Sequence, residues 1–144
     1  MLFSKVLNQR QKGEYPQGLS DKTINKVSAY CTDHFGCPLP EGYSKFLKEA
    51  NGFSYDGRSI FCCYNNEIQI AFPRYAGLDL VTFNTKFYEN TDISSYLMLG
   101  KSSIDYVCYE KASGMYLILT NGTMQLINKF DTFELLLDTF YGLS

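Results

Sequence analysis

Four apolar segments follow one another between residues 96 and 128, and short turn sequences separate them. Asn121-Gly122, in the last link, is among the strongest short signals for a β-hairpin because both residues tolerate positive φ. Met115–Leu119 is apolar at consecutive positions, which is typical of a strand covered on both faces. These features predict an antiparallel meander with strands at Tyr96–Leu99, Tyr106–Glu110, Met115–Thr120 and Met124–Asn128.

Helical periodicity precedes the meander. Asp21–Phe35 places its apolar residues at helical spacing, with Ser20 or Asp21 as the N-cap. Gly36 follows and can take the left-handed conformation that ends a helix. Residues 79–90 carry a less regular pattern, which fits either a short helix or an irregular packed segment. The sequence therefore predicts at least one long helix before the sheet.

A second helix is predicted from Pro40 to Ala50. Proline is well suited to a first helical turn, and an i, i+3, i+4, i+7 apolar stripe follows it. Asn51 closes this helix, and Gly52 is expected to have positive φ. Phe53 would then fold back onto the last turn, as in a Schellman-type cap.

A third helix closes the chain. Asp131 is predicted as its N-cap and Glu134 as the reciprocal capping-box residue, with Phe130 and Leu135 forming a hydrophobic staple. Gly142 would end it. Helices, then an antiparallel meander sheet, then a helix packed on that sheet make an α+β fold.

Length and charge restrict the class of protein. A chain of 144 residues fits one domain, 1–144, with residues 1–19 as an N-terminal extension packed on it. The net charge of -2 gives no sign of direct nucleic-acid binding. No apolar run reaches the length of a membrane span or of a signal-peptide core. The five cysteines are an odd number and include adjacent Cys62-Cys63, so we expect a reduced, cytoplasmic protein.

The strongest candidate for chemistry is Cys31-Thr-Asp-His34-Phe-Gly-Cys37, three potential metal ligands at steps of three. A structural zinc site needs four ligands, and Cys62 or Cys63 would supply the missing one only by a chance of the fold. Cys31 belongs to the apolar face of a helix, where cysteine behaves as a small hydrophobe. A Cys-His nucleophilic pair would have to include His34, the only histidine, and no other catalytic motif is present. We therefore expect no enzyme, no cofactor and no metal.

Several segments, taken in order, resemble one known family. They are Leu39-Pro40-Glu41-x-Tyr43-x-x-Phe46-Leu47, Asn51-Gly52-Phe53-Ser-Tyr55-Asp-Gly57, Ile60-Phe61, Leu99-Gly100, Asp105-Tyr106-Val-Cys-Tyr109 and Phe130-Asp131-Thr-Phe133-Glu134-x-Leu136-Leu137. Together they resemble the SUKH superfamily of Smi/Knr-type proteins, and most closely its YrhA-like branch, over residues 20–142. Lys101 departs from the pattern, since this branch often has an acidic stretch after the glycine.

The resemblance implies a non-catalytic binding fold. Bacterial members of the superfamily are often immunity proteins, which bind and neutralise toxins, many of them nucleases, that pass between competing cells. The expected partner is thus a toxin protein. Two alternatives remain open: a regulatory or scaffold protein with another cellular partner, and, more remotely, a metal- or cysteine-dependent enzyme built on Cys31, His34 and Cys37.

Candidate partner-binding residues are those that the folding pattern does not use. A few buried anchors inside a polar rim usually dominate such interfaces, and tyrosine is enriched among them. Each candidate has a competing explanation as a solvated turn or edge residue. Three follow the second helix on a predicted loop, one follows Pro73-Arg74 and one lies near the sheet rim: Tyr55, Asp56, Arg58, Tyr75 and Asp105.

Overall fold

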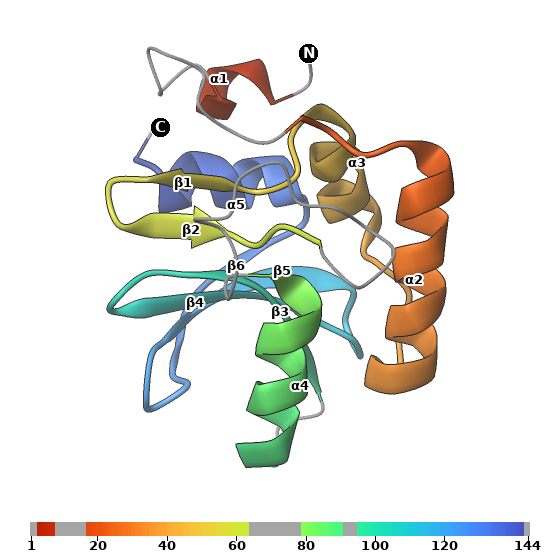
Figure 1. Ribbon diagram of the computed structural model, residues 1–144. Coiled ribbons are helices and arrows are strands. Elements are labelled where there is room, and N and C mark those ends of the chain that lie inside the picture. Colours follow the sequence, from red (N-terminus) through yellow and green to blue (C-terminus); the bar gives the residue numbers. More distant parts are fainter. Residues whose placement is uncertain (1–2, 8–16, 64–78, 91–94, 143–144) are drawn as a thin grey trace.

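The computed structural model describes residues 3–7, 17–63, 79–90 and 95–142 (Figure 1). Its core is a six-stranded sheet in which every strand pairs antiparallel with its neighbour in the sequence. The strands are β1 Phe53–Tyr55, β2 Arg58–Ile60, β3 Tyr96–Lys101, β4 Asp105–Glu110, β5 Met115–Thr120 and β6 Leu126–Phe130. The helices are α1 Ser4–Leu7, α2 Asp21–Phe35, α3 Glu41–Glu49, α4 Leu80–Asn90 and α5 Phe133–Phe140. The predicted α+β meander with a C-terminal helix is confirmed.

Helices α4 and α5 cover opposite faces of the sheet (Figure 1). On β4, the ring of Tyr106 packs against the ring of Phe83 from α4, with 6.1 Å between the ring centres. Three residues along, Tyr109 meets Tyr116 of β5 at 5.4 Å, and Tyr116 in turn meets Phe133 of α5 at 5.4 Å. Side chains three apart on a strand point to opposite faces. Both faces of the sheet are therefore covered at β4 and β5, which explains why β5 is apolar at consecutive positions.

The last strand begins two residues later than predicted. The link after Thr120 is a longer turn than Asn121-Gly122 alone, because the N–H of Met124 donates to Thr120 O at 3.0 Å. Gly122 has a φ of 94° and Met124 a φ of 57°. A residue with positive φ does not fit the extended strand, so pairing starts at Leu126.

The end of α3 also differs from the prediction. The helix stops at Glu49, and Ala50 is extended, with a φ of -155°, and pairs with Gln17. Gly52 does have positive φ, at 93°. However, Phe53 is the first residue of β1 and does not fold back as a Schellman cap.

The predicted start of α5 is displaced by one residue. Thr132 is the N-cap, since its Oγ1 accepts the N–H of Leu135 at 3.2 Å. Asp131 and Glu134 therefore do not form the predicted capping box. Leu135 is 53% exposed, so the predicted staple with Phe130 is also wrong. The caps of α2 are as expected: Ser20 accepts the N–H of Thr23, and Gly36 has a φ of 80°.

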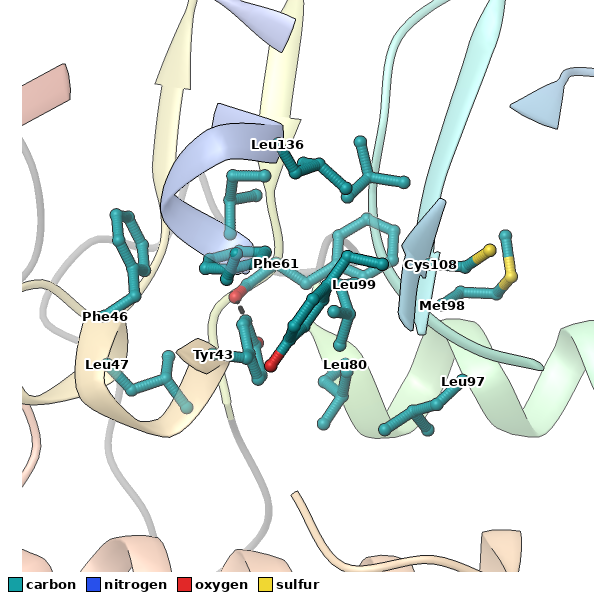
Figure 2. Packing of buried hydrophobic residues seen from close by; sticks show 14 of the residues in the cluster. Tyr43, Phe46, Leu47, Phe61, Leu80, Leu97, Met98, Leu99, Cys108 and Leu136 are labelled. Atoms are coloured by element: carbon teal, nitrogen blue, oxygen red, sulfur yellow. Dashed lines mark hydrogen bonds between the residues drawn. The ribbon is translucent and has the colours of Figure 1, made fainter. Parts of the chain in front are cut away.

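Figure 2 shows the core where α3, α5 and the sheet meet. Tyr43 of α3 is fully buried, and its hydroxyl donates to the carbonyl of Phe61 at 2.5 Å. The ring of Phe133 packs edge-on against Tyr43 at 5.8 Å and Phe46 at 5.9 Å. Phe3, before α1, is also buried against Phe46. The described helices include none that is both long and apolar enough to cross a lipid bilayer.

Two buried asparagines complete hydrogen bonding where strand pairing ends. Asn84 of α4 accepts the N–H of Met98 at 2.8 Å and donates to its carbonyl at 2.9 Å. Asn51 bonds Cys63 in the same way, accepting its N–H at 2.8 Å and donating to its carbonyl at 3.3 Å. Each side-chain amide thus takes the place of a neighbouring strand, which satisfies buried backbone groups that would otherwise be costly.

Candidate functional site

Three of the predicted partner-binding residues form one tight hairpin, and the predicted loop at this position is wrong. Tyr55 ends β1 and Arg58 begins β2, and the two are directly paired across the strands. Asp56 and Gly57 make the turn with φ of 53° and 74°. Two-residue hairpin turns with positive φ at both central residues favour Asp-Gly. This dipeptide was the available signal, but strands of three residues are too short to show a period.

Charge and aromatic contacts hold the hairpin side chains in place. Arg58 Nη1 lies 3.2 Å from Asp56 Oδ2 and donates to the carbonyl of Asp56 at 3.3 Å. The Asp56 side chain is 75% exposed, so this ion pair is a surface pair of small energy. The ring of Tyr55 is half-buried and stacks on Phe53, with 6.5 Å between ring centres and 28° between the ring planes. Tyr55 therefore serves the core as well as the surface.

The end of α5 anchors this hairpin to the body of the protein. The hydroxyl of Tyr141 donates to the carbonyl of Arg58 at 3.0 Å and lies 3.4 Å from the carbonyl of Phe53. Its ring also packs edge-on against Phe53 at 5.3 Å. The end of α5 thus holds the hairpin against the body of the protein.

The turn between β3 and β4 presents a residue that sequence reasoning missed. Ser102 organises it: its Oγ accepts the N–H of Asp105 at 3.0 Å, and its own N–H donates to the carbonyl of Asp105 at 2.8 Å. Ile104, at the tip, is 67% exposed. Asp105 is half-buried at the start of β4 and pairs with Thr120. In the sequence, Ile104 lies two residues before Tyr106, which is the spacing of a strand, so no signal marks it as a turn residue.

We call the end of the sheet that carries the turns 56–57, 102–104 and 121–125 the hairpin end. In an antiparallel meander, alternate turns lie at the same end of the sheet, as Figure 1 shows. A bond from the N–H of Asn121 to the carbonyl of Ile104, 2.8 Å long, ties two of the turns together. Asp105 lies at this end but is separated from Arg58 by β3. Tyr75 lies outside the described residues.

The cysteine and histidine residues do not form a chemical centre in the described part of the chain. Cys31 is fully buried on the apolar face of α2, and burial raises the pKa of its thiol to about 12. His34 is exposed; its ring stacks on Tyr30 at 3.8 Å, and its Nδ1 lies 3.0 Å from the carbonyl of Tyr30. Burial also raises the pKa of Cys37. Among the described residues, no three ligand-type side chains gather as a metal site would require.

The other cysteines share this environment. Burial raises the pKa of Cys62 to about 12 and moves the pKa of Cys63 and Cys108 in the same direction. The thiolate is the reactive form of cysteine, so these raised values disfavour nucleophilic chemistry. At the hairpin end, by contrast, the apolar side chain of Ile104 is exposed close to charged and polar groups.

Comparison with known proteins supports the fold alone. No family model and no curated protein matches the chain. A solved structure, that of a protein from Pseudomonas syringae pv. tomato, is similar over 91% of this chain and 92% of its own, with a TM-score of 0.59 and 12% sequence identity. At this identity, the chain shares an overall fold with that protein.

Proposed function

We propose that this protein is a non-catalytic protein-binding module of the SUKH type, an immunity protein that binds and neutralises a toxin protein through its hairpin end. The observation that carries the proposal is Ile104, a large apolar side chain that is 67% exposed at a turn tip. A large side chain that enters a partner's pocket and is fully desolvated there can carry much of the binding energy of an interface.

The surroundings of Ile104 suit such an anchor. Asp105 follows it directly, and the Asp56–Arg58 ion pair lies at the same end of the sheet. These charged groups would form the polar rim around Ile104. The turn is fixed by the bonds of Ser102 and by the bond from Asn121. A preformed surface loses little conformational entropy on binding, which favours the rapid and tight association that neutralisation of a toxin needs.

The resemblance of the sequence to SUKH proteins supplies the toxin as the partner class. Fold and family likeness alone do not define a function, so the proposal depends on a direct test. The chain should be co-expressed with each toxin-like protein encoded beside its gene. The expected result is copurification of one of them and rescue of growth.

A matched pair of variants locates the contact. Ile104→Asp should abolish growth rescue, while Leu135→Asp, at an apolar site on α5 that is 53% exposed, should leave it intact. Rescue that survives Ile104→Asp would exclude the hairpin end as the toxin-binding surface. If the protein protects growth against none of the neighbouring toxins, but copurifies with a housekeeping protein that it binds through Ile104, it would instead be a regulatory or scaffold protein.

A further inference from the structure

A pocket of about 420 Å³ lies at the end of the sheet opposite to the hairpin end. It opens between the first turns of α3 and α5 and the turn that joins β4 to β5. Four aromatic residues line it: Phe3, Tyr109, Tyr116 and Phe133. We call it the aromatic pocket. It lies outside the proposed toxin contact.

The aromatic rings are fixed by contacts with one another. The ring centre of Tyr116 lies 5.4 Å from that of Tyr109 and 5.4 Å from that of Phe133. The ring centres of Phe3 and Phe133 are 6.3 Å apart. The hydroxyl of Tyr116 also accepts the N–H of Gly42 at 3.0 Å, across 74 residues of sequence. Gly42 is necessary there, because a Cβ would lie 2.6 Å from the Cβ of Phe133. The pocket is thus part of the fold. Tyr109 is half-buried and offers its ring to a ligand, whereas Phe3, Tyr116 and Phe133 are at most 5% exposed and support it from below.

The rim of the pocket is acidic. Glu41, Asp131 and Glu134 contribute three carboxylates, and Lys45 contributes a single ammonium. Lys45 Nζ lies 3.1 Å from Glu41 Oε1, so this cation already has a partner. Neither Asp131 nor Glu134 has a basic partner within the described ranges. The pocket therefore carries an excess of two negative charges over an aromatic floor.

The two helix starts alone would favour an anion, because their free N–H groups and dipoles are positive. Glu41 and Glu134 stand in these first turns and offset that field. In addition, two of these N–H groups already have acceptors: the N–H of Gly42 donates to the hydroxyl of Tyr116, and the N–H of Leu135 donates to Thr132 Oγ1. The negative charge of the rim disfavours an anion, and so does the lack of free N–H donors at these two positions. Aromatic rings and carboxylates instead attract an organic cation.

We propose that the aromatic pocket receives an arginine or lysine side chain from a protein partner. The aliphatic stem would lie along the half-buried ring of Tyr109, and the cationic head would meet Asp131 and Glu134. A 420 Å³ cavity has room for one such side chain. The pocket is separate from Ile104, so this inference and the proposed function can fail independently.

The test uses the whole protein and a small probe, N-acetyl-arginine methylamide. Titration of labelled protein, followed by NMR, should give saturable shifts of the ring signals of Tyr109, Tyr116 and Phe133. The double variant Asp131→Asn/Glu134→Gln should weaken the probe between about twofold and thirtyfold, which is the range for two exposed ion pairs. Asp33→Asn, at an exposed acidic site on α2, should leave the affinity unchanged.

A neutral probe and an anion complete the experiment. N-acetyl-norleucine methylamide has a similar stem without the charge and should bind more weakly than the arginine probe. Inorganic phosphate should not shift these ring signals. The proposal is overturned if the neutral probe binds as well as the arginine probe, if phosphate binds in the pocket, or if the double variant binds the arginine probe as tightly as the natural protein does.

Discussion

Asn84 lies entirely inside the protein and joins α4 to the sheet, so its replacement by aspartate is a sharp test of the fold. Its Oδ1 accepts the N–H of Met98, and its Nδ2 donates to the carbonyls of Met98 and Leu80 at 2.9 Å and 2.8 Å. Aspartate keeps the shape and the acceptor but has no N–H donor. A protonated aspartate could still donate to one carbonyl, whereas an aspartate anion would face both carbonyls without water.

The size of the effect follows from protonation. In Asn84→Asp, burial and the two carbonyls should hold the pKa of the new carboxyl group above 7 in the folded state. In the unfolded chain it titrates near 3.9, about three pH units lower than 7. The variant should therefore lose about 4 kcal/mol of unfolding free energy between pH values below 4 and pH 7. Stability is present below the unfolded pKa and is lost as the pH rises.

Urea unfolding followed by circular dichroism at pH 4 and pH 7 measures this loss. The pH dependence of the natural protein is subtracted. Thr85→Asp, at the next and exposed position of α4, serves as the control and should show little added pH dependence. If Asn84→Asp has the same pH dependence as this control, the side chain does not bridge α4 and β3 as described.

Three further predictions concern the first turn of α3, the β1–β2 turn and the buried thiols. Tyr116→Phe should lower the free energy of unfolding by about 0.5–1.5 kcal/mol in urea titration, because the N–H of Gly42 loses its acceptor; an unchanged midpoint would contradict this role. Gly57→Ala should cost about 1 kcal/mol in the same assay, since its φ is 74° and an added Cβ meets no other atom, and Gly57→Asn should cost less. Burial raises the pKa of Cys31 and of Cys62 from 9.0 to about 12, so unfolding releases protons above pH 9. The free energy of unfolding should then fall by up to about 1.4 kcal/mol per pH unit for each thiol between pH 9 and 12, and a constant value over that range would show that these thiols are not buried.

The meander could be predicted because its signals are local. Apolar segments of about six residues with turn residues between them specify both the strands and their antiparallel order. Two boundaries were predicted one or two residues too early: the start of β6 and the N-cap of α5. Met124 takes positive φ, and Thr132, not Asp131, caps α5, and neither choice is visible in an apolar pattern.

Other features depend on contacts far apart in the sequence. Asn51 reads as a helix terminator, yet its side chain is used to pair with Cys63. Hairpin β1–β2 has three residues in each strand, so Asp56-Gly57 was its only strong local signal. The exposure of Ile104 follows from the way its turn projects from the sheet, which no local pattern encodes. The candidate residues Tyr55, Asp56 and Arg58 were found by what the folding pattern left unused, and the structure gathers them in one hairpin.

The most direct test of the central claim is calorimetric titration of the purified protein with the toxin that copurifies with it. The natural protein and Leu135→Asp should bind with equal affinity. Ile104→Asp should bind at least about thirtyfold more weakly, as the loss of a hot-spot residue requires. If Ile104→Asp binds the toxin as tightly as the natural protein, the hairpin end is not the toxin-binding surface and the account is contradicted.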